Sequence, residues 1–261
     1  MPFHDYQNTI INFLYIILEK ICAFFTDRIV VVAEEMKIKA LNKGIGKPEQ
    51  YIKVFSGMYL DLFLNSFKSR DTERIKLEIP KDAIVIGTIA RLFPLKGHEY
   101  IFSIAQALIT KYPNIIFLWV GDGILKDKYQ ELINSKNLNK NFIFTGLVLP
   151  EEISKYLSVM DILVHTSLRE GLARVLPQSL ASGIPVVSFD IDGAKEVIIN
   201  NETGFLVPPK NTFDLQNRIE EYIKSPALRE KIRNNGKKIV DPFFRHTYMV
   251  DSLKNIYQET E

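Results

Sequence analysis

A chain of 261 residues is long enough for one large core with additional elements, and its content of 46% hydrophobic and 25% charged residues is ordinary for a globular protein. The net charge of +2 is too small to favour nucleic acid as a partner, although it suits an anionic substrate or a membrane surface. The single cysteine, Cys22, excludes an internal disulfide framework and fits a reducing compartment.

Residues 8–25 are the most apolar early segment, with apolar side chains around most of a predicted helix. Its most apolar run, residues 10–18, ends at Glu19 and Lys20, far short of the roughly 20 residues that a membrane-spanning helix needs. No cationic region or cleavage site marks it as a signal peptide. Where nothing covers this helix, we expect it to expose an apolar face, which marks a protein or membrane contact.

Short elements follow this helix. The apolar run at residues 29–32 predicts a strand buried on both faces. A helix is expected at residues 34–41 and a short strand at residues 51–55. Residues 56–80 are predicted to form a polar linker.

From about residue 81 the strand and helix patterns alternate strictly. Continuous apolar strands that alternate with helices indicate an α/β protein with a doubly wound parallel sheet. Strands are predicted at residues 83–89, 115–120, 142–145, 162–165, 186–189 and 204–207. Helices are predicted at residues 97–111, 124–134, 151–158, 173–182, 194–199, 212–224, 228–238 and 246–257.

The segment HTSLREGLARVLPQSLASGIPVVSFDID, residues 165–192, combines the end of a strand, a turn, a short helix and the next strand. Glu170 and Gly171 make the turn, and Gly183 supplies a left-handed cap at the end of the helix. This order places a carboxylate and free backbone N–H groups at the carboxyl end of a strand. Open α/β sheets bind phosphorylated ligands there, because the first N–H groups of the helix lack partners and its dipole favours an anion.

Two cations follow the first strand of the predicted sheet. Arg91 and Lys96 lie in the sequence IARLFPLKGHEY, in which Gly97 opens a helix. Fixed cations at the carboxyl end of a strand suit a diphosphate, because arginine makes forked contacts and lysine acts as a point charge. The alternative is a pair of solvated surface cations.

The segment EGLARVLPQSLASGIPVV resembles the signature of the retaining glycosyltransferases of family 4, which have the GT-B fold. That signature is a glutamate, seven other residues and a second acidic residue. Glu170 matches its first position, and Gln178 stands at the second. The resemblance implies a nucleotide-sugar-binding module that faces an acceptor-binding N-terminal module across a cleft.

The resemblance also implies a division of the chain. Residues 1–55 are expected to be a remnant of the acceptor-side N-terminal domain, and residues 56–80 a hinge. Residues 81–240 are expected to form the Rossmann-like nucleotide-sugar-binding domain, and residues 241–261 the C-terminal crossover helix. We therefore expect a donor-binding half that lacks most of the acceptor half.

Roles in catalysis follow from the same resemblance. Arg91 and Lys96 would neutralise the donor diphosphate and the departing nucleotide, and Glu170 would contact the transferred sugar. Gln178 would hold the ribose with weaker, uncharged bonds than a glutamate would, although it would also fit a decayed copy. An alternative role for Glu170 is a carboxylate that serves only the helix dipole.

The resemblance implies that several loops bind the donor. For the two turns before the signature, the alternative is that their residues serve only the geometry of the loops. The turn after the second strand would lie beside the nucleotide, and the turn after the third would line the base pocket. Backbone N–H groups after Glu170 would reach the phosphate or the sugar. These donor-binding residues are Gly121, Asp122, Gly123, Thr145, Gly146, Leu147, Gly171, Leu172, Ala173 and Arg174.

We expect no metal site and no cofactor. Asp190 and Asp192 spell the D-x-D motif of metal-dependent glycosyltransferases, but that motif belongs to a different fold. Asp192, Gly193 and Ala194 are better interpreted as a turn and helix start near the donor sugar. The four histidines are scattered, and His165 is expected to be packed and hydrogen-bonded rather than a base.

The first hypothesis is a metal-independent hexosyltransferase that uses a UDP or GDP sugar and a glycan or lipid-linked acceptor at the cytoplasmic membrane face. Acceptor binding and water exclusion need the other half of the cleft. A partner polypeptide, or a homo-oligomer formed through residues 8–25, would supply it, and peripheral membrane contact is a further possibility. The rival is a non-catalytic nucleotide-sugar-binding subunit or truncated pseudoenzyme. A sugar-nucleotide epimerase of similar fold is a third alternative.

Overall fold

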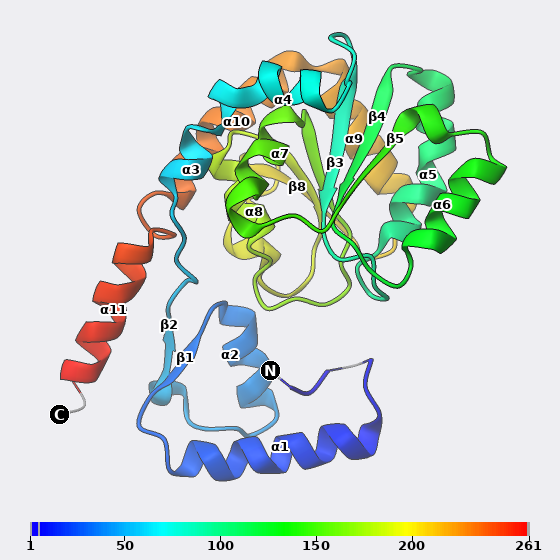
Figure 1. Cartoon of the computed structure of the whole chain (residues 1–261). Helices are drawn as coiled ribbons and strands as arrows, with labels where there is room; N and C mark the ends of the chain where they lie inside the picture. Colours follow the sequence, from blue (N-terminus) through cyan, green and yellow to red (C-terminus); the bar gives the residue numbers. More distant parts are fainter. Residues whose placement is uncertain (1, 5, 260–261) are drawn as a thin grey trace.

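A six-stranded sheet forms the centre of the larger part of the molecule (Figure 1). The computed structural model describes residues 2–4 and 6–259. The strand order is β5-β4-β3-β6-β7-β8 and every pairing is parallel, so the predicted doubly wound α/β sheet is confirmed. The strands are β3 (Ile84–Ile89), β4 (Ile115–Val120), β5 (Phe142–Gly146), β6 (Ile162–His165), β7 (Val186–Phe189) and β8 (Gly204–Val207).

Helices cover both faces of this sheet, because strands with apolar side chains on both sides must bury each of them. One apolar core joins the sheet to α5 (His98–Lys111), α6 (Lys126–Ser135) and α9 (Thr212–Lys224). The other core joins the opposite face to α7 (Ile153–Val159) and α8 (Val175–Ala181). Helix α10 (Pro226–Val240) packs against α8. Short 3₁₀ turns precede β5 and α7, at Asn139–Asn141 and Pro150–Glu152.

The segment that we expected as a polar linker is largely helical. It contains α3 (Asp61–Leu64), a 3₁₀ turn (Ser66–Ser69) and α4 (Arg70–Lys76). Phe63 is buried in the core of the sheet module, and the buried Arg74 donates hydrogen bonds to the carbonyls of Pro80 and Ala83 at 2.9 and 2.7 Å. The expectation was wrong because helices this short carry too few apolar residues to show a period, and tertiary contacts hold them.

The N-terminal part is a small unit of its own beside the sheet module (Figure 1). Strands β1 (Ile29–Val31) and β2 (Tyr51–Lys53) pair in parallel and are linked by α2 (Glu34–Asn42) and a 3₁₀ turn (Pro48–Gln50). The strand at residues 29–32 was expected to be buried on both faces, but Val30 is 43% exposed. The expectation was wrong because only one face of a two-stranded sheet is covered here. A small core contains Ala23, Val31, Ala40, Ile45 and Tyr51.

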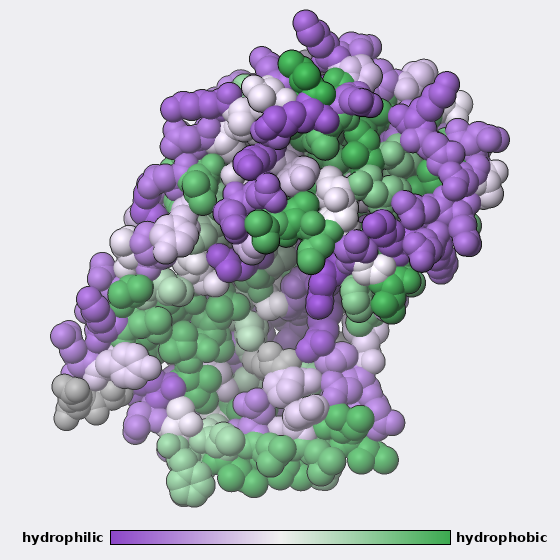
Figure 2. Space-filling model, viewed as in Figure 1, coloured by the Kyte–Doolittle hydropathy of each residue, from purple (hydrophilic) through white to green (hydrophobic). Residues whose placement is uncertain are grey.

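Helix α1 (Thr9–Phe24) turns most of its apolar residues outward. Phe13 is 63% exposed and Phe24 is 83% exposed, whereas Ala23 is the buried residue of this helix. Figure 2 shows a continuous hydrophobic band along α1 at the lower edge of the molecule. The expected exposed apolar face is confirmed. None of the helices in the described ranges is long and apolar enough to cross a membrane.

The C-terminal helix α11 (His246–Gln258) leaves the sheet module and runs on the side of the N-terminal part (Figure 1). Its start is fixed to the segment after β2, since Met58 donates to the carbonyl of Phe244 at 2.9 Å and His246 donates to that of Met58 at 3.0 Å. Phe244 also stacks on Phe55, with ring centroids 4.5 Å apart. None of the residues within α11 is buried.

Candidate functional site

The loops after β3, β4 and β5 are joined by backbone hydrogen bonds at the carboxyl ends of these strands. Leu92 donates to the carbonyl of Asp122 at 2.9 Å, and Gly121 donates to that of Gly146 at 3.1 Å. Gly121 has φ of +138°, and a Cβ atom there would lie 2.2 Å from the carbonyl oxygen of Ala90. Only glycine allows the two loops to approach so closely.

The loops after β3 and β6 are joined in the same way. Leu168 donates to the carbonyl of Leu95 at 2.8 Å, and the hydroxyl of Thr166 donates to the carbonyl of Gly97 at 2.9 Å. A Cβ atom on Gly97, which has φ of +77°, would lie 2.0 Å from the carbonyl oxygen of Thr166. This close contact brings the start of α5 against the loop that carries the signature glutamate.

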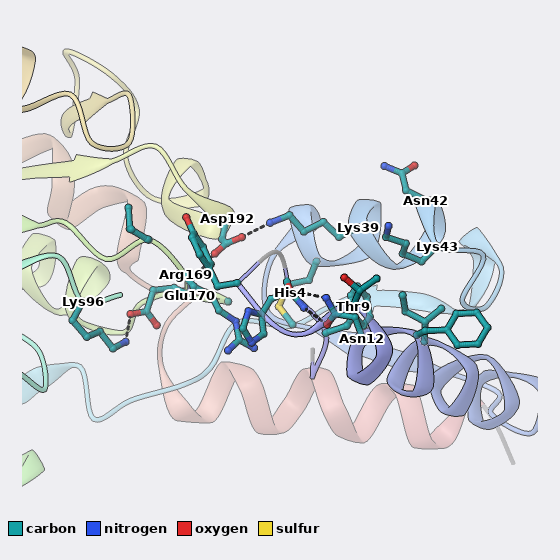
Figure 3. A pocket seen from close by; sticks show the side chains of 17 residues that line it. His4, Thr9, Asn12, Lys39, Asn42, Lys43, Lys96, Arg169, Glu170 and Asp192 are labelled. Carbon is teal, nitrogen blue, oxygen red and sulfur yellow. Dashed lines mark hydrogen bonds and ion pairs between the residues drawn. The ribbon is translucent and has the colours of Figure 1, made fainter. Parts of the chain in front are cut away.

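Lys96 and Glu170 form an ion pair across these two loops (Figure 3). The ammonium nitrogen of Lys96 lies 2.5 Å from one carboxylate oxygen of Glu170, and Nε2 of His165 lies 3.8 Å from the same oxygen. Burial alone would raise the pKa of Glu170, but His165 and Lys96 favour the anion and lower the pKa to about 2. Glu170 is therefore ionised at neutral pH.

The backbone of Glu170 is held by Asp192, which lies just beyond β7. The N–H of Glu170 donates to Oδ2 of Asp192 at 2.7 Å, and the N–H of Gly193 donates to the carbonyl of Gly171 at 2.9 Å. The other carboxylate oxygen of Asp192 forms an ion pair with Lys39 of α2 (Figure 3). The N-terminal part thus contacts the signature loop directly.

A cavity of about 770 Å³ lies between the N-terminal part and the sheet module. Lys96, Glu170 and Asp192 line it from the sheet module, as the close view in Figure 3 shows. Polar and apolar side chains of α1, α2 and the segment before α1 line the opposite side. These are Phe3, His4, Tyr6, Thr9, Asn12, Phe13, Ile16, Met36, Lys39, Asn42 and Lys43.

Arg91 is not brought into this cavity. Its side chain is exposed, and its guanidinium lies over the ring of Phe93 at 5.0 Å from the ring centre. Of the two cations that the sequence predicted at one phosphate site, the structure therefore places Lys96 against Glu170 and leaves Arg91 on the adjoining surface. Both remain at the carboxyl end of β3.

The predicted nucleotide turns lie next to each other on the adjoining strands. Asp122 accepts the N–H of Gly123 at 2.7 Å and pairs with Lys126 at 3.3 Å. The hydrogen bond from Gly123, together with Lys126, lowers the pKa of Asp122. The hydroxyl of Thr145 donates to the carbonyl of Gly146 at 3.0 Å, whereas Leu147 is 82% exposed.

The residues after Glu170 take different positions. Leu172 packs against the core of the sheet module and Ala173 is buried within it. Arg174 is exposed, and its guanidinium lies 3.4 Å from the carbonyl oxygen of Gly57. Gln178 lies on α8 and is partly exposed. Helix α8 begins at Val175, two residues later than expected, so the backbone of Gly171–Arg174 lies in the loop.

The expectations for His165 and for residues 194–199 have clear outcomes. His165 is 4% exposed and its Nδ1 lies 3.3 Å from the hydroxyl of Ser188, so a packed, hydrogen-bonded histidine is confirmed. The helix expected at residues 194–199 is wrong, because a 3₁₀ turn, η5 (Asp192–Glu196), stands there instead. Asp192 has φ of +44°, which an α-helix does not allow. Within residues 2–4 and 6–259, no three His, Cys, Asp or Glu residues are grouped so that they could hold a metal ion.

The link between Lys39, Asp192 and Glu170 was not found from the sequence. Lys39 lies more than 130 residues before Glu170, so no spacing connects the two. The aspartate before Gly193 was interpreted as part of a turn near the donor sugar, and the structure places it in a turn beside Glu170. The contact itself depends on how α2 packs on the sheet module.

Comparisons with known proteins bear on the family and the fold of the chain. Residues 69–239 match the family model described as glycosyl transferases group 1. The capsular polysaccharide biosynthesis glycosyltransferase CapM of Staphylococcus aureus is 27% identical over 255 residues, which are 94% of this chain and 65% of that protein. The UDP-Gal:alpha-D-GlcNAc-diphosphoundecaprenol alpha-1,3-galactosyltransferase of Escherichia coli is 24% identical over 98% of this chain and 66% of its own length.

A solved structure has the same fold. HepE of Anabaena, crystallised with UDP and glucose, aligns with a TM-score of 0.82 and 22% identity, over 93% of this chain and 66% of that chain. The expected fold, the Rossmann-like C-terminal half of a GT-B protein with part of the N-terminal domain, is confirmed. The chain spans just under two thirds of the length of each of these three proteins.

Proposed function

The chain belongs to the glycosyl transferases group 1 family, and from this premise we propose that it is the donor-binding half of a retaining hexosyltransferase that needs no metal ion. The donor is a nucleoside diphosphate sugar, and the acceptor is a glycan or lipid-linked sugar in polysaccharide assembly. The ion pair of Lys96 and Glu170 carries this proposal. It places an ionised carboxylate and a cation together on the wall of a cavity, at the strand ends where such sheets bind phosphorylated ligands.

The two partners of this ion pair have separate roles. Lys96, with Arg91 on the adjoining surface, neutralises the diphosphate, and Glu170 binds hydroxyl groups of the sugar. Donor binding exchanges one anion for another, because the diphosphate replaces Glu170 on the ammonium group of Lys96. Glu170 then becomes available to the sugar. The pair therefore holds both groups in place before the donor arrives.

The transfer step needs no protein nucleophile. The acceptor hydroxyl forms a bond to C1 of the sugar on the face from which the nucleotide leaves, while the bond from C1 to the diphosphate oxygen breaks. The bonding electrons leave with the diphosphate, which takes up the proton of the hydroxyl. Lys96 and Arg91 stabilise the negative charge that develops on the leaving group.

A uridine nucleotide is the preferred donor in this proposal, since HepE was crystallised with UDP and the Escherichia coli relative is named for UDP-galactose. The turn at residues 121–123 lies beside the nucleotide, and residues 145–147 line the base pocket. Gln178 binds the ribose hydroxyls through an amide that has one acceptor and two donors. The backbone of residues 171–174 approaches the phosphate and the sugar.

The acceptor side requires more than residues 1–55, which form the small N-terminal domain in this proposal. Residues 56–80 connect it to the donor domain at residues 81–240, and residues 241–261 return toward it. Water exclusion requires a full second wall. A partner polypeptide that resembles an N-terminal GT-B module, or a second copy, supplies that wall and covers the apolar residues of α1. Peripheral attachment at the cytoplasmic face of the membrane is the alternative cover for α1.

One residue favours a second candidate function. Gln178 stands where the family signature has a second acidic residue, and its amide makes weaker, uncharged bonds to a ribose. The chain would then be a nucleotide-sugar-binding subunit without transfer activity of its own. Donor binding is common to both candidates, so turnover in the presence of an acceptor distinguishes them.

Calorimetric titration of the purified chain with UDP and GDP tests the donor site. We expect one of the two nucleotides to bind with a dissociation constant on the order of micromolar, as a bidentate phosphate contact supports. The Lys96→Ala and Arg91→Ala variants should lose this binding, whereas Glu170→Ala should retain UDP and lose the added affinity for a UDP sugar. An unaltered chain that binds neither nucleotide would contradict the proposal.

A further inference from the structure

Asp192 joins the signature loop to the N-terminal part with both of its carboxylate oxygens. Oδ2 accepts the backbone N–H of Glu170 at 2.7 Å, and Oδ1 forms an ion pair with the ammonium group of Lys39. The side chain of Asp192 is 12% exposed, so water competes little for its contact with the Glu170 amide, whereas Lys39 is 46% exposed and water reaches the ion pair from the lysine side. The three residues come from η5, α2 and the loop after β6.

The backbone at this position restricts which residues can make these contacts. Asp192 has φ of +44°, in the left-handed region that glycine, asparagine and aspartate tolerate best. Glycine would offer no acceptor, and asparagine would offer one oxygen and two donors that face Lys39 unfavourably. Aspartate alone of the three supplies two acceptors and a charge.

Helix α2 is held on η5 by further polar contacts. The carboxylate of Glu196 accepts the N–H of Glu34, at the start of α2, at 2.6 Å and pairs with Lys53 at 2.8 Å. Lys195 pairs with Glu35 at 3.0 Å. Because α2 is fixed at its start, Lys39 is presented to Asp192 from a rigid element.

Apolar packing holds the same junction from the other side. A Cβ atom on Gly171 would lie 3.2 Å from the sulfur of Met36 and 3.5 Å from a methyl group of Val32. A Cβ atom on Gly193 would lie 2.8 Å from the Cβ atom of Ala33. The turn after Glu170 therefore packs directly on the β1–α2 connection.

We propose that Asp192 is a positioning residue for the donor sugar and that Lys39 couples it to the acceptor side. The carboxylate of Asp192 fixes the backbone of Glu170, and Lys39 fixes the carboxylate. The orientation of Glu170 toward the sugar then depends on where α2 sits. This inference rests on the proposed role of Glu170, and it adds two residues that act through Glu170 without contact to the diphosphate.

Hydrogen exchange at the Glu170 amide tests the positioning in the free chain. With ¹⁵N-labelled protein, Asp192→Asn should raise the exchange rate of this amide by about tenfold or more, because the neutral amide oxygen is a weaker acceptor than the carboxylate and its NH₂ group is repelled by Lys39. Lys39→Met should raise it by a smaller factor. Asp190→Asn and Lys37→Met are the matched controls, and they should leave the exchange rate of the Glu170 amide unchanged. The amides of β3 should exchange at the same rate in all four variants as in the unaltered chain.

An unchanged rate at Glu170 in Asp192→Asn would overturn the proposal. Exchange that rises equally at Glu170 and throughout β3 would overturn it too, because the substitution would then act on overall stability. Asp192→Glu keeps the charge but lengthens the side chain, and it should restore the contact to Lys39 without restoring protection of the Glu170 amide. Protection of that amide in Asp192→Glu would argue that charge alone decides its exchange.

Titration with UDP and with UDP-glucose, UDP-galactose and UDP-N-acetylglucosamine tests the consequence for the donor. Asp192→Asn should bind UDP within about threefold of the unaltered chain and lose about tenfold in its preference for the favoured sugar nucleotide. If Asp192→Asn keeps the preference for the favoured sugar nucleotide, the positioning role is refuted and the proposed function stands. The same holds if the unaltered chain shows no preference among the three sugar nucleotides. If the unaltered chain binds none of the four while the Glu170 amide responds to Asp192→Asn, the proposed function fails and the structural link stands.

Discussion

At the scale of single residues, opposing effects of burial and charge decide the protonation states of the side chains in the site. Glu170 is partly buried, which disfavours its anion, yet Lys96 and His165 keep its pKa at about 2. One loop away, His98 is 1% exposed, and burial together with the nearby Lys96 lowers its pKa to about 4. Near neutral pH the site therefore holds an ionised glutamate and, behind it, a neutral histidine.

The Lys96–Glu170 pair should show strong coupling in a double-mutant cycle. Lys96→Met leaves a half-buried carboxylate without its main partner, so we expect a loss of about 1–3 kcal/mol in the free energy of unfolding. Glu170→Gln in addition should recover most of that loss. Urea unfolding at pH 7 measures all four proteins. Losses that simply add would mean that the two side chains do not stabilise each other.

His98 should make stability depend on pH below neutrality. Its pKa falls from 6.5 in the unfolded chain to about 4 in the folded chain, so the unfolded state binds the extra proton between these values. Stability is complete above pH 6.5 and decreases as the pH falls toward 4, by about 3 kcal/mol at most.

The His98→Phe variant isolates this effect. Neither ring nitrogen of His98 has a hydrogen-bond partner among residues 2–4 and 6–259, and its ring makes an edge contact with Trp119 at 4.9 Å that phenylalanine can keep. We expect the variant to unfold in urea at nearly the same concentration at pH 7 and pH 5. The carboxylate of Glu170 does not interfere, because its contribution is lost only as the pH falls from about 4.5 toward 2. An equal decline in both proteins would remove His98 as the cause.

At the scale of elements, α1 and α2 have opposite relations to the rest of the molecule. Helix α2 has a mostly polar sequence and is bound to η5 by ion pairs. Helix α1 is apolar but leaves that surface largely in solvent. An apolar helix whose outer residues stay exposed marks a surface that contacts another molecule. The two helices together explain why the N-terminal part is attached firmly to the sheet module yet exposes apolar side chains on its outer side.

Association through α1 should be visible in solution. Phe13, Phe24 and the other exposed apolar side chains of α1 lie on one helix, as in an apolar patch that marks a contact surface. In sedimentation experiments we expect the unaltered chain to be larger than 30.1 kDa or to bind vesicles of anionic lipid.

Substitution on α1 should abolish that association. Phe13→Glu combined with Phe24→Glu is the test variant, and Phe213→Glu on α9 is its control, since Phe213 is 74% exposed on the sheet module. The variant should sediment as a single chain that ignores lipid, and the control should behave like the unaltered protein. An unaltered chain that is already monomeric and indifferent to vesicles would show that α1 needs no cover.

At the scale of the whole molecule, the cavity between the two parts is where the proposed chemistry takes place. One wall comes from the sheet module and carries Lys96 and Glu170, and the other comes from α1, α2 and the segment before them. The second wall also carries Lys39, which contacts the first through Asp192. A change in the position of the N-terminal part would therefore alter the proposed donor site as well as the width of the cavity.

Much of the sheet module could be predicted from the sequence. Buried parallel strands are continuous apolar runs, so β4, β6, β7 and β8 lie at the expected residues. Glu170 and Lys96 were also expected at one site, because parallel strands bring the loops at their carboxyl ends to one edge. These features depend on local pattern and on the topology of the fold.

Contacts between distant segments were decided only by the tertiary structure. The sequence did not predict helices at residues 61–76, which are stabilised by burial of Phe63 and by hydrogen bonds of Arg74. It did not place Arg91 outside the cavity or Lys39 against Asp192. Local sequence patterns indicate which side chains are buried. The ion pairs between α2 and η5 depend instead on how the folded N-terminal part packs on the sheet module. The sequence therefore determined the sheet and the edge at which its strands end, and the packing of the N-terminal part determined how Glu170 is held there.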